Sequence, residues 1–184
     1  MPSSKPALIA RHWLLTWTTY GTWLPGDKRG FVSPVCTPAG NLTIHNQPGT
    51  PCDRNMPALM RSAQARMKGK PIFLRHRQAE TLLSQFQETA NYRGWQLLAA
   101  AIMRAHIHLL VGVPGDPEPE TLLRDFKAYG SRALNRQWSK PKSGTWWTES
   151  GSRRKKQGPA ILAAVRYVAQ QKNPLLVWIH PNWQ

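Results

Sequence analysis

Two histidines separated by one residue, His106 and His108, form the most informative potential site in this sequence. Residues 105–113 alternate in the manner of a β-strand, so both imidazoles should point to one face of a sheet while Ile107 points to the other. Neutral imidazole is the commonest metal ligand in proteins, and two imidazoles on one strand face can bind a single ion together. Taken alone, the pair also fits two surface histidines on an exposed strand.

A tyrosine and a glutamine four residues apart, Tyr167 and Gln171, form a second potential site. Pro159 and the apolar spacing after it predict a helix over residues 159–171, and residues at i and i+4 share one helix face. That face could carry a nucleophilic phenol together with an amide oxygen that binds a metal. Tyr167 also fits a packing residue whose hydroxyl lies at the edge of the core.

Positive charge is concentrated in two segments that follow the histidine strand. Residues 118–138 predict a helix with one basic side, and residues 139–158 read as a basic, glycine-containing loop. Such a loop is often simply solvated, but the charge of the whole chain favours phosphate binding. The residues of these segments that we expect to contact nucleic acid are Arg124, Lys127, Arg132, Arg153, Arg154, Lys155 and Lys156.

The chain has 184 residues, with 25 lysines and arginines against 9 aspartates and glutamates, so its formal net charge is +16. The positive charges of a domain this basic repel one another unless an anionic partner neutralises part of them. The sequence contains neither an apolar run of the ~20 residues that a membrane span needs nor a signal-peptide core. We therefore expect a cytoplasmic, nucleoid-associated protein that binds nucleic acid and no membrane. Cys36, His45 and Cys52 do not have the spacing of a zinc finger or ribbon.

The elements that must position these residues are strands interspersed with helices, without regular βαβ spacing. This order predicts an α+β fold in which helices cover one face of an antiparallel sheet. We expect one domain over residues 1–184, with an irregular insertion at 31–57 that can hold short strands. The expected strands are 11–18, 95–103, 105–113 and 175–179, of which 95–103 and 105–113 can also be read as one long strand; the expected helices are 58–68, 76–91, 118–138 and 159–171.

Together these residues resemble a known family of transposases. The triplet His106-Ile107-His108 is similar to the HUH signature, in which a hydrophobic residue separates two histidines. Tyr167 followed by Gln171 looks like the helix of that family that carries one nucleophilic tyrosine.

Two longer segments extend the resemblance over most of the chain, from about residue 11 to 180. Residues 166–175 are similar to the corresponding region of REP-associated tyrosine transposases, and residues 12–27 look like the first strand and loop of insertion-sequence-200-type transposases. The resemblance implies a ferredoxin-like HUH endonuclease core with a C-terminal tyrosine helix packed across the sheet. It also implies a Mg²⁺ or Mn²⁺ ion bound by the two histidines and by Gln171, with Gln170 as the alternative third ligand.

The chemistry that the resemblance implies is metal-dependent cleavage and rejoining of single-stranded DNA. Tyr167 would attack the scissile phosphate to give a covalent 5′-phosphotyrosine and a free 3′-hydroxyl. A phenol, whose ordinary pKa is about 10, needs a nearby cation to ionise at neutral pH. The substrate would be a DNA hairpin, with Tyr20 and Trp23 stacking on unpaired bases and the 153–156 segment holding the hairpin backbone.

Two other functions remain compatible with the sequence. A non-catalytic single-stranded nucleic-acid-binding protein would use the basic residues alone, and a hydrolytic HUH-type nuclease would cut without forming a covalent adduct. Family members act as monomers or homodimers, and the sequence leaves both open.

Overall fold

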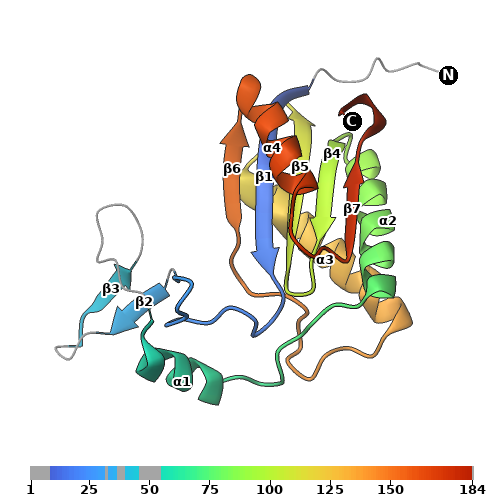
Figure 1. The fold of residues 1–184 in the computed structure, drawn as a ribbon. Helices are drawn as coiled ribbons and strands as arrows, with labels where there is room; N and C mark the ends of the chain where they lie inside the picture. The colour runs from blue at the N-terminus through green and yellow to red at the C-terminus, as the bar shows by residue number, and fades with distance from the viewer. Residues whose placement is uncertain (1–8, 32, 37–39, 46–54, 184) are drawn as a thin grey trace.

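The computed structural model describes residues 9–31, 33–36, 40–45 and 55–183. Its centre is a five-stranded sheet in the order β6-β1-β5-β4-β7, in which every neighbouring pair is antiparallel (Figure 1). The predicted α+β antiparallel architecture is therefore confirmed. The strands are β1 (Ile9–Thr18), β4 (Gln96–Ile102), β5 (His106–Pro114), β6 (Ser152–Lys156) and β7 (Leu176–Ile179).

The topology explains the ferredoxin-like character of the core. The chain runs β1, α2 (His76–Tyr92), β4, β5, α3 (Pro119–Gln137) and β6, which is the βαββαβ order of that fold. The two segments expected at 95–113 are separate strands, because Met103 donates its N–H to the carbonyl of His106 across a tight turn at 2.9 Å. After α4 (Pro159–Ala169), β7 extends the sheet beside β4, and a short 3₁₀ helix (Pro181–Trp183) follows.

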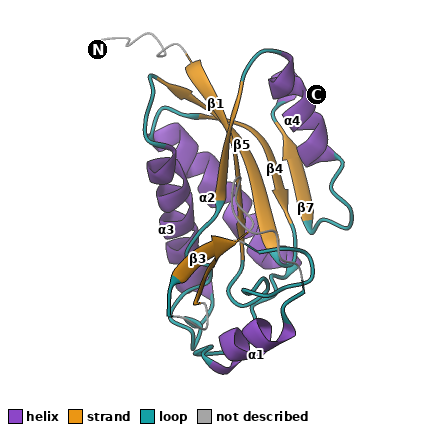
Figure 2. Ribbon diagram, turned by 90° about the vertical axis from the view of Figure 1, so that its left-hand side faces the viewer, coloured by secondary structure: helices purple, strands orange, loops and turns teal. Residues whose placement is uncertain are grey.

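Helices cover both faces of the sheet, so the expectation of one covered face is wrong. Helices α2 and α3 lie on one face and α4 lies on the other (Figure 2). The cause is visible in β4, which is apolar on both sides, and in β5, whose residues are buried on both sides, so both faces of the sheet need cover. The apolar stripe of α4, formed by Ala164, Val165 and Val168, packs on Leu14 and Leu110 of the sheet.

The α2/α3 side of the sheet contains the larger core. Trp17 of β1 is 1% exposed and meets Phe86 of α2 and Trp147 edge-on, with ring centroids 5.7 and 6.0 Å away. Phe86 in turn meets Phe126 of α3 edge-on at 5.7 Å. These aromatic contacts fix both helices against β1, the strand that lies beside the histidine strand.

The basic run at 152–156 is a strand rather than part of a loop, which corrects the prediction for residues 139–158. It forms β6, which pairs with the free side of β1 from Thr16 opposite Ser152 to His12 opposite Lys156. Short, charged edge strands resist pairing with other chains, and β6 is an edge strand of this kind. Residues 139–151 of the predicted loop connect α3 to β6.

The segment after β1 contains short strands, as the sequence allowed. Strands β2 (Ser33–Cys36) and β3 (Leu42–His45) form a separate two-stranded sheet, and α1 (Pro57–Ala65) follows them. Figure 1 places this hairpin and α1 beyond the lower end of the main sheet. Cys52 and the side chains of Cys36 and His45, considered above as zinc ligands, lie outside the described part of the structure. No helix in the described ranges has the length and apolar character needed to cross a membrane.

Candidate functional site

The two histidines of β5 lie next to each other on the face of the sheet that α4 covers. The ring centroids of His106 and His108 are 4.9 Å apart. Strand register places His108 opposite Thr16 of β1, and the Thr16 hydroxyl shares a 2.7 Å hydrogen bond with Nδ1 of His108. This bond orients the ring and leaves Nε2 as the nitrogen that can accept a metal ion.

Burial keeps both imidazoles neutral at physiological pH. It lowers the pKa of His108 from 6.5 to about 4, with a smaller contribution from repulsion by His106. Burial also lowers the pKa of His106, and the nearby positive charge of Arg29 adds to this effect. A metal ligand needs an unprotonated imidazole. The donor pair therefore fits a divalent cation.

Tyr167 reaches the same place from α4. Its ring centroid lies 5.3 Å from that of His108, in an edge-on arrangement. Val168, the next residue, is fully buried, and this anchors the helix while Tyr167 stays 49% exposed beside it. The structure thus brings together His106, His108 and Tyr167, as the sequence motifs predict, with the phenol accessible to a substrate.

Gln171, the predicted third metal ligand, does not lie on the helix that carries Tyr167. Helix α4 ends at Ala169, two residues earlier than predicted, since the backbone of Gln170, the C-cap residue, leaves the helical conformation at φ −94° and ψ +15°. Gln171 therefore lies just beyond the helix, where its Nε2 donates to the carbonyl of Tyr167 at 2.9 Å.

The two histidines have no third strong metal donor beside them within the described ranges, which contain no group of three or more His, Cys, Asp or Glu residues able to hold a metal. A further ligand from this part of the protein would be a neutral oxygen, such as the side-chain carbonyl of Gln171. Two imidazoles and neutral oxygens match Mn²⁺ at least as well as Mg²⁺, which prefers an all-oxygen set.

The loop after β1 is fastened to the histidine strand. The hydroxyls of Thr19 and Thr22 both donate to the carbonyl of Ala105, the residue before His106, at 3.1 Å. Both predicted stacking residues lie in this loop. Trp23 is 38% exposed, whereas Tyr20 is partly buried and its hydroxyl accepts the N–H of Lys68 at 2.8 Å.

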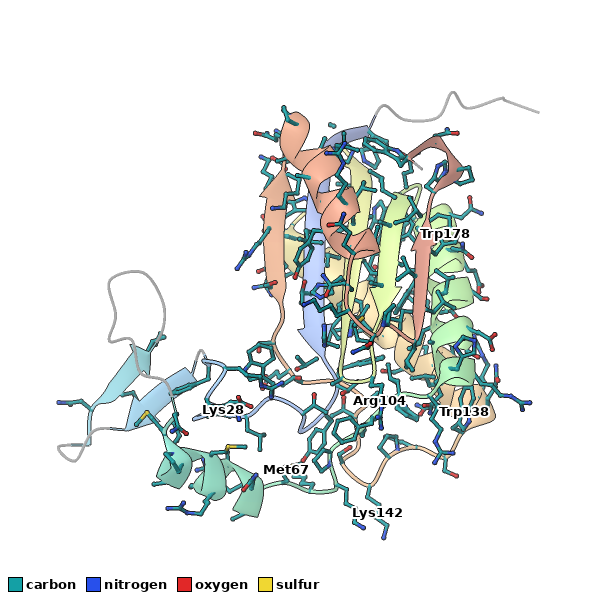
Figure 3. The ribbon with its side chains drawn as sticks, viewed as in Figure 1. Lys28, Met67, Arg104, Trp138, Lys142 and Trp178 are labelled. Carbon is teal, nitrogen blue, oxygen red and sulfur yellow. The ribbon has the colours of Figure 1, made fainter. Side chains whose placement is uncertain are left out.

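An arginine that the sequence analysis did not single out lies on that loop. Arg29 forms an ion pair with Asp27, and its guanidinium carbon lies 4.6 Å from the centre of the Trp23 ring. The only sequence signal is an acidic and a basic residue two positions apart in a glycine-flanked turn. Figure 3 places the neighbouring Lys28 and the turn residue Arg104 at the same lower end of the main sheet.

The basic residues of α3 lie on the opposite face of the sheet from the histidines. Lys127 is directed inward, where its ammonium group donates to the carbonyls of Thr148 at 2.5 Å and Glu149 at 2.7 Å. Burial lowers its pKa to about 8. Its contacts are those of a residue that fixes the loop before β6, whereas the predicted phosphate contact has no direct support in this geometry. Arg124 and Arg132 are exposed, and Arg132 lies over the Tyr129 ring at 5.0 Å.

Alternation along β6 divides its four basic residues between the two faces. Arg154 and Lys156 pair with Leu14 and His12, so they share the face of the histidines. Arg153 and Lys155 lie on the other face. Arg153 forms an ion pair with Glu120 at 2.9 Å.

A groove of about 540 Å³ lies on the α3 side of the molecule, away from the histidines. Arg124, Lys127 and Arg153 line it together with Glu120 and Trp147. All three have intramolecular partners, but the ion pair of Arg124 with Asp125 is long, at 3.5 Å, and its side chain is 71% exposed, so Arg124 is the one most available to an anionic ligand.

Acid should destabilise the metal-free protein through His108. Its folded-state pKa lies below the ordinary 6.5, so the unfolded chain takes up the proton first as the pH falls. The stabilising contribution is complete above about pH 6.5 and is lost as the pH falls toward 4. By pH 5 the loss has reached about 2 kcal/mol of unfolding free energy. Urea unfolding with EDTA at pH 7.5 and pH 5 should show a smaller loss for His108→Asn than for wild type. An equal loss in both proteins would contradict the assignment.

Two solved structures are similar to this chain. One is a REP-associated tyrosine transposase bound to a REP hairpin, with 10% identity, coverage of 91% of this chain and 70% of the other, and a TM-score of 0.46. The second is a candidate transposase from Deinococcus radiodurans, with 14% identity, coverage of 94% and 99%, and a TM-score of 0.42. No curated protein matches the chain.

The family comparison covers the residues of the site. The model of the family described as IS200-like transposase matches residues 65–171, which is more than half of the chain. This range begins before α2 and ends at Gln171, so it contains both histidines and Tyr167. The chain therefore belongs to the IS200-like transposase family.

Proposed function

We propose that this transposase cleaves and rejoins single-stranded hairpin DNA through a covalent 5′-phosphotyrosine on Tyr167. The observation that carries the proposal is the 5.3 Å separation between the rings of Tyr167 and His108, which come from segments about sixty residues apart in the sequence. A strand and a helix on the same sheet face place an accessible phenol beside two neutral imidazoles. This arrangement suits nucleophilic attack at a phosphate better than it suits packing.

His106 and His108 would hold the Mg²⁺ or Mn²⁺ ion, with Gln171, or Gln170 in its place, as the third ligand. The ion would polarise the scissile phosphate and neutralise part of its charge. The hydrogen bond from Thr16 keeps Nε2 of His108 directed away from β1, and the depressed pKa of both imidazoles supports binding at neutral pH.

In the cleavage step, the phenolic oxygen of Tyr167 forms a bond to phosphorus while the bond from phosphorus to the 3′ oxygen breaks. The phenol loses its proton and the departing 3′ oxygen gains one. The product is a 5′-phosphotyrosine with a free 3′-hydroxyl, and attack by a 3′-hydroxyl in the reverse direction rejoins the strand. No ATP is needed, because the covalent bond to Tyr167 retains the energy of the phosphodiester.

The DNA would approach from the β6 edge of the sheet. Arg154 and Lys156 lie on the histidine face of that edge, so they are better placed than the α3 residues to hold a hairpin backbone next to the site. Trp23 would stack on an unpaired base, and Tyr20, whose hydroxyl is already bonded, would contribute less. The net charge of +16 supports a nucleoid-associated location in the cytoplasm.

The test is a denaturing gel of the protein with end-labelled single-stranded hairpin DNA from the flanks of its own gene. We expect a covalent protein–DNA band with Mn²⁺ and none with EDTA. Cleavage without the band would instead support a hydrolytic nuclease. Binding without cleavage of any flanking hairpin would support the non-catalytic alternative.

A further inference from the structure

We propose that Arg29 is a phosphate-binding residue that holds the single strand at the rim of the histidine site, with the exposed face of Trp23 stacking on the adjacent base. The inference goes beyond the active-site residues and rests on the proposed function only in assuming that single-stranded DNA enters this site. It concerns binding, so it can be tested without cleavage.

A continuous series of hydrogen bonds places Arg29 beside the site. Nη2 of Arg29 donates to the carbonyl of Thr22 at 2.8 Å, and the hydroxyl of Thr22 donates to the carbonyl of Ala105 at 3.1 Å. Ala105 immediately precedes His106.

The loop is also fixed from the side of α1. The N–H of Met56 donates to the carbonyl of Gly26 at 2.9 Å. Gly26 has φ of +87°, and a Cβ atom there would lie 2.4 Å from the carbonyl oxygen of Met56, so only glycine allows this approach. Arg29 therefore lies on a rigid loop, and little further conformational entropy of the loop is lost when a ligand binds.

The guanidinium is already oriented, and part of it has no partner among the described residues. Nε and Nη2 donate to the buried carboxylate of Asp27 at 2.9 and 2.5 Å, and the plane lies over the Trp23 ring. These bonds and the bond to Thr22 use three of the five N–H groups of the side chain. Within the described ranges, no acceptor bonds to Nη1, so its two N–H groups can be directed to a phosphate.

The surroundings distinguish this arginine from one that only neutralises Asp27. The Asp27 side chain is 7% exposed, whereas that of Arg29 is 49% exposed, so an incoming phosphate meets the cation before the anion. Trp23 is the only one of the nine tryptophans classed as exposed. Its indole N–H donates to the carbonyl of Gly30 at 2.6 Å, which fixes the ring, and the exposed part of the ring is available to a base. A stacking face beside phosphate donors is the combination that holds single strands.

The experiment measures binding of the same hairpin DNA by fluorescence anisotropy in EDTA, using a series of probes that each carry one uncharged methylphosphonate linkage. We expect wild type to lose affinity about five- to tenfold at a particular linkage near the cleavage position. Arg29→Gln should bind the unmodified probe more weakly by a similar factor and should no longer respond to that linkage, because each change removes the same contact.

Arg77→Gln is the matched control, because it removes one exposed positive charge from α2 on the other face of the sheet. It should respond to the modified linkages as wild type does. Arg29→Lys should retain a response at the same linkage, since an ammonium group still binds phosphate. If Arg29→Gln melts at a lower temperature than wild type, the response of Arg29→Lys is the result that tests the proposal. A full response in Arg29→Gln, or no response in Arg29→Lys, would overturn the proposal. Absence of a covalent adduct in the gel assay would count against the proposed function and not against this contact.

Discussion

Replacing Tyr167 by phenylalanine should abolish formation of the covalent adduct and lower the rate of strand cleavage by about 10³-fold or more. The change removes the only atom that can attack phosphorus from this position. It retains the aromatic ring beside His108, so the packing of α4 should persist. Binding of hairpin DNA should change by less than about twofold, because the hydroxyl contributes one contact at most. The measurements are single-turnover cleavage with Mn²⁺ and anisotropy binding with EDTA.

Tyr92→Phe is the control for this substitution. Tyr92 is 75% exposed at the end of α2, on the other side of the sheet, so loss of its hydroxyl should leave cleavage and adduct formation unchanged. Persistence of the covalent band in Tyr167→Phe would show that another residue is the nucleophile. Loss of cleavage together with loss of DNA binding would instead indicate that Tyr167 contributes to the binding surface.

The features that the sequence predicted best depend on short-range periodicity. Alternation over residues 105–113 placed both imidazoles on one strand face, and the spacing of apolar residues after Pro159 placed Tyr167 beside a buried helical stripe. Both inferences need only the two-residue and 3.6-residue repeats of regular structure. The approach of Tyr167 to His108 was not contained in either repeat, and it entered through the resemblance of the motifs to a family.

The features that the sequence did not predict depend on pairing between distant segments. Residues 152–156 have no apolar alternation, so nothing local identifies them as a strand; β6 forms because β1 has a free side. The position of α4 opposite α2 and α3 follows from the apolar character of both faces of β4, which a sequence cannot assign to particular helices.

The contacts around the site also depend on pairing between distant segments, which the sequence did not predict. Thr16 is a partner of His108 only because the register between β1 and β5 places them opposite each other. Lys127 was expected to contact DNA because it lies on a basic helix, but three carbonyls of the segment before β6 surround its ammonium group. The number of basic residues is readable from sequence, whereas which of them are already bonded is decided by the fold.

Removing the imidazole of His108 should eliminate metal-dependent cleavage, whereas removing the hydroxyl that orients it should weaken metal binding without eliminating it. For His108→Ala we expect a loss larger than the roughly 10- to 100-fold in metal affinity that an outer partner of a metal ligand contributes. For Thr16→Val we expect a loss within that range, because the His108 ring remains but is no longer held through Nδ1. Raising the Mn²⁺ concentration should therefore restore cleavage in Thr16→Val and leave His108→Ala inactive.

The control for Thr16→Val is Thr18→Val, on the same strand and the same face. Thr18 lies opposite His106 in the register, but its hydroxyl bonds to Thr148 rather than to an imidazole. Its replacement should change the Mn²⁺ dependence of cleavage much less than that of Thr16. His108→Asn, whose amide can still reach Thr16, serves as a second ligand variant if His108→Ala is poorly folded. Equal Mn²⁺ titration curves for Thr16→Val and wild type would show that the hydrogen bond does not tune the site, and full activity of both His108 variants would remove His108 from the metal site altogether.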